Sequence, residues 1–207
     1  KYIILGLKVS DFEVEGTEVA FDEKKGTYKP IEIKLENGKT VEIVGKIDRI
    51  DIAKTADGNY IRIIDYKSSV KDINLNEVKA GLQLQLLTYM DAVCEIEDVL
   101  PAGVLYFNLI DPTIKANSHL SQEEIEFELR KQFKMKGLIL ADIDVAQMMD
   151  TNLEKGSSNV IPAYVDKEGN LSQKSSSVTR KQFEDLQKYT KNMLSKISEE
   201  ILSGKID

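Results

Sequence analysis

Residues 40–68, TVEIVGKIDRIDIAKTADGNYIRIIDYKS, decide the fold predicted for this chain. Apolar and polar residues alternate through residues 40–53, which is the period of a half-buried β-strand. Residues 60–68 form a second, isoleucine-rich strand, and Asp57-Gly58 between them is a typical two-residue hairpin turn. We therefore expect two antiparallel strands joined by a tight turn.

A third strand is predicted immediately before this pair. Residues 31–35, IEIKL, alternate in the same way, and Asn37-Gly38 follows as a strong hairpin signal. The whole segment from residue 31 to residue 68 is thus predicted to be a β-meander.

The pattern then changes to a helical period. Apolar residues recur every three or four positions over residues 75–93, which predicts one largely buried helix. Residues 101–110, PAGVLYFNLI, form a compact apolar run that is typical of a core strand. A meander, a helix and a strand in this order indicate an α+β or α/β domain with a central sheet flanked by helices.

The remaining sequence predicts mostly helices. Ser121 and Glu124 have the spacing of a capping box before a helix reaching about residue 136. Further helices are expected over about 142–150 and about 179–203, the last ending at Gly204, with a short hairpin over 160–174.

Three polar residues stand out in the meander because strand geometry brings them together. With the turn at Asp57-Gly58, Lys67 falls opposite Asp48, and Asp65 falls opposite Ile50. Residues that are opposed or two apart share a face, so Asp48, Asp65 and Lys67 should project from one face.

Strand parity separates a fourth polar residue from these three. Asp51 should point to the other face of the sheet, so Asp48 is preferred to Asp51 as a site residue.

The chemistry of these three side chains suits a metal-dependent hydrolase. Two carboxylates from adjacent strands suit Mg²⁺, which prefers oxygen ligands, and the backbone carbonyl of Tyr66 is a further candidate ligand. Lys67 could orient an attacking water or stabilise charge on the phosphate. The alternative is a surface Asp–Lys ion pair, but charges after Ile61, Ile63 and Ile64 are costly without a function.

Gln85 and Tyr89 share one face of the predicted helix because they are four residues apart. Their spacing supports two interpretations equally. They either line the metal site and contact the DNA backbone, or serve core packing and hydrogen bonding.

Composition limits the remaining possibilities. One cysteine, Cys94, excludes an internal disulfide and fits a buried thiol, and the lone His119 cannot anchor a zinc site. No apolar run reaches the roughly 18 residues of a membrane span. The net charge of −7 argues against broad capture of DNA by this chain alone, since duplex binding requires neutralised phosphates.

Taken in order, these motifs resemble a known family. Residues 45–48 (GKID), 64–69 (IDYKSS) and 85–89 (QLLTY) resemble the RecB-like branch of the PD-(D/E)XK nucleases, with a restriction-endonuclease-like fold. The chain is also similar to the C-terminal nuclease domain of the B-type subunit in AddAB-type ATP-dependent helicase–deoxyribonucleases. The segments that carry this similarity are GKIDRID, YIRIIDYKSS, GLQLQLLTYMDA and PAGVLYFNL. EVAF at residues 18–21 resembles the preceding strand of that family.

This resemblance implies a role for each motif. Asp48 and Asp65 would be metal ligands for Mg²⁺, or Mn²⁺ in its place, and Lys67 would be the catalytic lysine. Gln85 and Tyr89 would be the supporting, DNA-contacting pair. The implied function is that of an exodeoxyribonuclease that processes double-strand breaks for recombinational repair in the bacterial cytoplasm. Its partners would be DNA and the A-type subunit of the helicase–nuclease, with no membrane.

Parts of the family pattern are missing. An acidic or histidine residue upstream of the first strand would precede Lys1, and Cys94 matches none of the family's four iron–sulfur cysteines. We expect this chain to be a fragment that begins within a strand, lacks the cluster and could be inactive by itself. We expect it to be one nuclease domain (1–207), with a catalytic core over about 18–110 and a mainly helical remainder over 111–207.

Two other functions fit the sequence. One is a non-catalytic domain with a nuclease fold that guides DNA or serves in subunit docking, and the other is a stand-alone RecB-like exonuclease.

Overall fold

The computed structural model describes residues 2–24, 26–109, 114 and 120–204. Within these residues, the centre is a mixed six-stranded sheet in the order β1-β4-β5-β6-β7-β10. Neighbouring strands are antiparallel, except for the parallel pairs β5–β6 and β7–β10. The strands are β1 (Glu13–Phe21), β4 (Gly45–Thr55), β5 (Gly58–Lys67), β6 (Leu100–Asn108), β7 (Lys136–Leu140) and β10 (Ser177–Val178). The predicted fold class, an α+β domain with a mixed central sheet flanked by helices, is confirmed.

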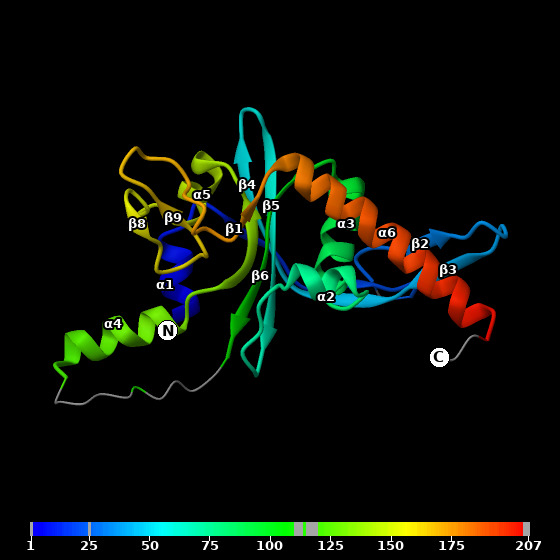
Figure 1. Cartoon of the computed structure of the whole chain (residues 1–207), viewed down its shortest axis with the longest axis horizontal. Helices are drawn as coiled ribbons and strands as arrows, with labels where there is room; N and C mark the ends of the chain where they lie inside the picture. Colours follow the sequence, from blue (N-terminus) through cyan, green and yellow to red (C-terminus); the bar gives the residue numbers. More distant parts are fainter. Residues whose placement is uncertain (1, 25, 110–113, 115–119, 205–207) are drawn as a thin grey trace.

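Helices cover both faces of this sheet (Figure 1). One side carries α2 (Leu75–Lys79), α3 (Gln85–Glu97) and α6 (Arg180–Leu202). The other side carries α1 (Tyr2–Lys8), α4 (Gln122–Gln132) and α5 (Ile143–Met149). The strand β6 is buried from Ala102 to Asn108, which confirms the core strand predicted from its apolar run. The strand-like start that the sequence suggested is wrong, because residues 2–8 form the helix α1.

The hairpin β4–β5 has a different register from the predicted one. Thr55 pairs with Gly58, so the two turn residues are Ala56 and Asp57 rather than Asp57 and Gly58. The Thr55 hydroxyl donates to the Gly58 carbonyl at 2.6 Å and closes this turn. The ladder is therefore displaced by two residues, which keeps every side chain on its predicted face because the period of a strand is two.

The predicted meander is divided between two sheets. The hairpin β2 (Ile31–Lys34) and β3 (Thr40–Ile43) turns through Asn37-Gly38 as expected, but forms a sheet of its own. Exposed Val44 separates β3 from β4. The main sheet instead places β1 beside β4, so its antiparallel part is β1-β4-β5.

The helix predicted over residues 75–93 is wrong as one element, because it is two helices. Gly81 has φ +79° and Gln83 has φ +52°, values outside the helical region. The Leu82 amide donates back to the Glu77 carbonyl and ends α2. The second helix, α3, therefore starts at Gln85, so this side chain lies in its first turn.

The C-terminal half mixes helices with short strands. The helix α4 begins with the predicted capping box at Ser121 but ends at Gln132, before β7, and α5 lies within its predicted range. The helix α6 begins at a second capping box at Thr179 and is followed by Gly204 at φ +72°. Strands β7 and β10 extend the main sheet, while β8 (Gly156–Ser157) and β9 (Tyr164–Val165) pair separately.

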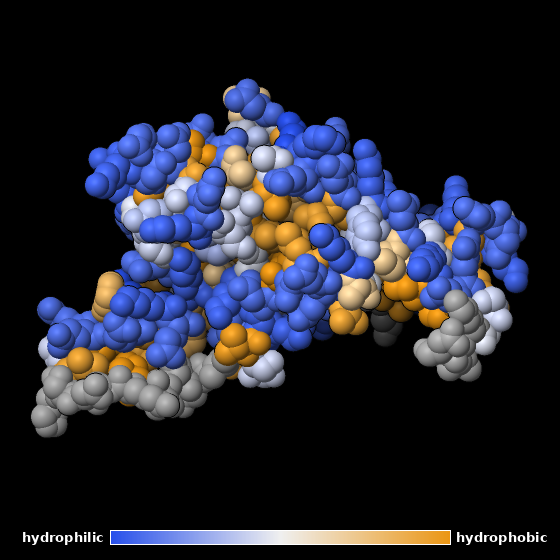
Figure 2. Space-filling model, in the orientation of Figure 1, coloured by the Kyte–Doolittle hydropathy of each residue, from blue (hydrophilic) through white to orange (hydrophobic). Residues whose placement is uncertain are grey.

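The outer surface is largely hydrophilic in the view of Figure 2, with an apolar region in the middle over α3 and α6. Nearly a third of the chain is charged, which accounts for this coverage. No helix among the described residues is long and apolar enough to cross a membrane.

Candidate active site

The structure brings Asp48 and Asp65 together on adjacent strands. Arg49 pairs with Ile64, so one further step along the β4–β5 ladder sets Asp48 opposite Asp65. Asp48 Oδ2 accepts a hydrogen bond of 2.9 Å from the backbone amide of Tyr66, the residue after Asp65. The two carboxylates therefore flank one peptide unit at the end of β5.

Lys67 completes the group. Its Nζ lies 2.6 Å from Asp65 Oδ2, and its side chain is about a third exposed. Asp65 itself is buried, with 5% of its surface exposed, so its charge is paired mainly with the Lys67 ammonium. The group thus combines a buried carboxylate with a cation that reaches solvent.

Burial raises the pKa of Asp65 above its usual value. The adjacent charge of Asp48 raises it further, while Lys67 acts in the opposite direction. A second positive charge between the two aspartates would relieve both unfavourable effects. A divalent cation would provide such a charge.

Asp51 lies on the opposite face, as strand parity predicts. It is fully buried, and both of its oxygens accept hydrogen bonds from Arg49, at 2.6 Å and 2.5 Å. Arg62 Nε donates to the same carboxylate at 2.9 Å. Because Asp51 is held by two buried guanidinium groups, it is a structural carboxylate.

Gln85 and Tyr89 meet at the beginning of α3. Gln85 Nε2 donates to the Tyr89 hydroxyl at 3.3 Å. Tyr89 is buried, and its ring stacks on Phe21 with 5.6 Å between the centroids. A Cβ added to Gly45 would overlap the Tyr89 hydroxyl and come within 2.9 Å of its Cζ. Tyr89 therefore holds α3 against the first residue of β4, three positions before Asp48.

Two residues of β6 that sequence reasoning missed also lie beside the site. Tyr106 pairs with Asp65 and Asn108 pairs with Lys67 across the parallel β5–β6 ladder. Burial and the charge of Asp65 raise the pKa of Tyr106 to about 12. Asn108 Oδ1 accepts a hydrogen bond of 2.9 Å from the Lys71 amide and so fixes the chain after β5. The available signal was two polar groups within the otherwise apolar run LYFNL.

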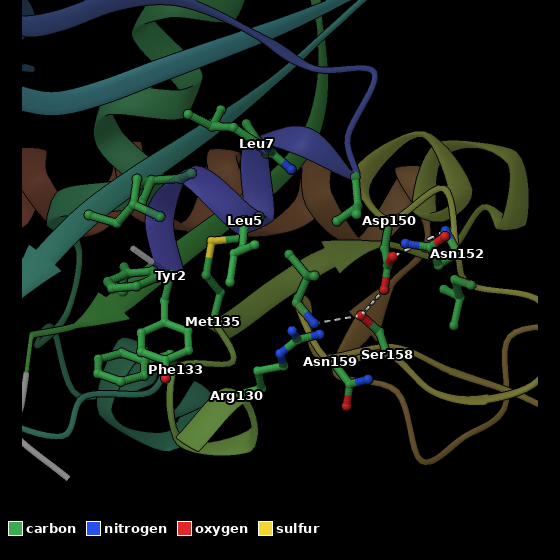
Figure 3. Close-up of a pocket in the computed structure, with 18 of the residues that line it drawn as sticks. Tyr2, Leu5, Leu7, Arg130, Phe133, Met135, Asp150, Asn152, Ser158 and Asn159 are labelled. Carbon is green, nitrogen blue, oxygen red and sulfur yellow. Dashed lines mark hydrogen bonds between the residues drawn. The ribbon is translucent and has the colours of Figure 1, made fainter. Parts of the chain in front are cut away.

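A pocket lies elsewhere, under α1 (Figure 3). It has a volume of about 200 Å³, and its walls include Tyr2, Phe133 and Met135. Arg49 and Arg62 also line it, but Asp48, Asp65 and Lys67 do not. By strand alternation, the candidate active site is thus on the side of the sheet away from this pocket.

The ligands available for a metal ion are few. The described residues contain no group of three or more His, Cys, Asp and Glu side chains that could hold one. The site thus offers two carboxylates and backbone oxygens, a donor set of the kind that suits Mg²⁺, which retains several waters. Among the other candidates, burial raises the pKa of Cys94 to about 12, in keeping with an unreactive thiol, and His119 lies outside the described residues.

The fold, with an Asp-x-Lys motif ending a central strand and a second aspartate opposite it, defines a class of nucleases. The chain belongs to the PD-(D/E)XK nuclease superfamily, whose family model matches residues 7–207.

Similar proteins place the chain more narrowly within this superfamily, because they share one name. It is 48% identical over 212 residues to a protein of Clostridium novyi that is named as the B-type subunit of an ATP-dependent helicase/deoxyribonuclease. Proteins of the same name from Acetivibrio thermocellus and Bacillus subtilis are 46% and 44% identical. These matches cover 96–99% of this chain but only 18% of each relative. The predicted resemblance to the nuclease domain of the B-type subunit is confirmed.

Proposed function

We propose that this chain is a divalent-metal-dependent exodeoxyribonuclease domain of a helicase–nuclease that processes double-strand breaks. The observation that carries the proposal is the convergence of Asp48, Asp65 and Lys67 at the end of one strand pair. The names of the relatives support DNA as the substrate and another subunit of a helicase–nuclease as the partner, which on this proposal is the A-type subunit. On this proposal residues 1–207 form one nuclease domain that acts in the bacterial cytoplasm.

Asp48 and Asp65 would hold the metal, with the Tyr66 carbonyl as a further ligand. The burial of Asp65 and its raised pKa support this assignment, because a cation at that carboxylate would offset the cost of burying its charge. Mg²⁺, or Mn²⁺ in its place, would polarise the scissile phosphate and lower the pKa of a bound water.

The remaining residues would act on the attacking water, the phosphate and the DNA backbone. Lys67 Nζ, anchored at Asp65, would orient the attacking water and stabilise charge developing on the phosphate oxygens. Gln85, which is exposed in the first turn of α3, would contact the DNA backbone, and buried Tyr89 would support it through its hydroxyl.

The test uses the helicase–nuclease complex with Asp65→Ala or Lys67→Ala. We expect cleavage of one DNA strand to fall by about a hundredfold or more while unwinding continues, since Asp65→Ala removes a metal ligand and Lys67→Ala removes charge stabilisation at this site alone. Asp57→Ala and Lys54→Ala, at exposed positions near the distant β4–β5 turn, are matched controls and should cleave normally. Normal cleavage of both strands by the site variants would overturn the proposal.

A non-catalytic docking or DNA-guiding domain remains the second candidate, favoured by the net charge of −7. Calorimetric titration of the chain with Mn²⁺ separates the two functions. Binding that is lost in Asp48→Ala supports the nuclease, and absence of binding at millimolar Mn²⁺ supports the docking domain.

A further inference from the structure

We propose that Tyr66, anchored by Arg49 on the far face of the sheet, is the positioning residue that sets the spacing of the two metal-binding carboxylates. This inference rests on the proposed function and assigns Tyr66 a side-chain role beside its backbone carbonyl. The contacts that fix the spacing of Asp48 and Asp65 lie on both faces of the sheet.

The backbone of Tyr66 contacts the metal-site face of the sheet, while its side chain lies on the opposite face. Its backbone amide donates to Asp48 Oδ2 at 2.9 Å, and its neighbours in the chain are Asp65 and Lys67. Its side chain points the other way, because successive side chains of a strand alternate. A change in the position of this side chain therefore moves the peptide unit that separates the two carboxylates.

The Tyr66 side chain is fixed at its tip. Its hydroxyl accepts a hydrogen bond of 3.1 Å from Arg49 Nη1, and its ring packs edge-on against Phe107. Arg49 is the residue after Asp48 on the neighbouring strand. The bond thus joins, from behind, the two strands that carry Asp48 and Asp65.

Arg49 is itself held rigidly. Nε and Nη2 make a two-pronged bond to Asp51, which is fully buried and also bonded by Arg62. The Arg62 guanidinium in turn lies over the Phe12 ring, 4.8 Å from its centroid. The Tyr66 hydroxyl is therefore bonded to a buried donor that two hydrogen bonds to Asp51 hold in place, which is what a positioning contact requires.

The same arrangement makes the contact testable without unfolding the protein. Arg49 lines the cavity of about 200 Å³ under α1. In Tyr66→Phe the released Arg49 Nη1 can bond to water in that cavity, while the ring still packs on Phe107. Only the hydroxyl bond is removed.

The matched control is Tyr60→Phe. Tyr60 lies on the same strand and the same face, six residues earlier, beside the turn. In the part of the chain that the structure describes, its hydroxyl makes no hydrogen bond to protein. This substitution removes a hydroxyl of the same kind without touching Arg49.

The first measurement is amide hydrogen exchange of the metal-free 207-residue chain by NMR. We expect the amide of residue 66 to exchange about ten times faster in Tyr66→Phe than in the unmodified chain, because its bond to Asp48 is loosened. Tyr60→Phe should leave this rate unchanged. An unaltered rate in Tyr66→Phe would overturn the inference, whether or not the chain binds metal.

The second measurement is calorimetric titration with Mn²⁺. Loss of a group that orients metal ligands weakens affinity by about tenfold or more, and we expect this for Tyr66→Phe but not for Tyr60→Phe. Faster exchange combined with unchanged Mn²⁺ affinity would also overturn the positioning role. If the unmodified chain binds no Mn²⁺, the proposed metal-dependent function fails, and the exchange rates still decide whether Tyr66 positions Asp48.

Discussion

At the scale of single residues, two carboxylates of β4 have opposite roles although only three positions separate them. Asp48 is partly exposed and accepts one bond from a backbone amide, whereas Asp51 is fully buried between Arg49 and Arg62. Alternation along the strand is the reason, because it sends one carboxylate to each face. Asp48 can therefore accept a ligand, whereas Asp51 stabilises the sheet through its bonds to Arg49 and Arg62.

This difference predicts opposite responses to the same substitution. Asp51→Asn should lower the free energy of unfolding by about 3–5 kcal/mol, because it leaves two buried guanidinium groups without a counter-charge. Asp48→Asn should change it by less than about 1 kcal/mol and act on Mn²⁺ affinity instead. Urea unfolding at neutral pH measures both values. Equal losses of stability in the two variants would contradict the assignment.

At the scale of elements, the contact between β4 and α3 connects the GKID and QLLTY motifs. Gly45 begins β4, and the Tyr89 hydroxyl occupies the space that any Cβ at this position would need. Tyr89 also stacks on Phe21 of the neighbouring strand β1. The glycine is thus required for close approach of a helix rather than for an unusual backbone angle.

Gly45→Ala should therefore destabilise the protein by about 1–3 kcal/mol through overpacking. Tyr89→Phe removes the closest atom, so part of this loss should be recovered in the double variant. Thermal unfolding of the single and double variants tests the coupling. Gly6→Ala is the control, because its added Cβ would make only an ordinary contact of 3.6 Å with Val160. Strictly additive effects of the two substitutions would argue against the contact.

At the scale of the whole molecule, the net charge and the length of the chain bear on how strongly it can bind DNA. The chain is acidic, with 35 carboxylates against 28 lysines and arginines, and spans about a fifth of the length of the curated relatives it matches. Duplex DNA is held mainly through neutralised phosphates. On the proposed function, the candidate active site would act on DNA that other parts of the helicase–nuclease hold.

This inference predicts weak binding of duplex DNA by the chain alone. The dissociation constant for a short blunt duplex at physiological salt should be weaker than about 10⁻⁴ M, the upper end for non-specific binders. Fluorescence anisotropy with a catalytically silent Asp65→Asn variant measures it without cleavage. Micromolar affinity with a steep dependence on salt would show that the chain holds DNA by itself.

The sequence by itself determined the features that depend on local periodicity. Alternation placed Asp48, Asp65 and Lys67 on one face and Asp51 on the other, and the capping residues Ser121 and Glu124 located the start of α4. The predicted faces of these strand residues are unchanged by a two-residue shift in register, because the side-chain period of a strand is two.

Only the tertiary structure decided which strands and side chains meet. In the structure, the turn lies at Ala56 and Asp57, the predicted helix is interrupted at Gly81, and Tyr106 lies beside Asp65. The tertiary structure also joined Tyr66 to Arg49 across the sheet. Such contacts depend on the packing of distant segments, and no local pattern in either segment specifies the partner.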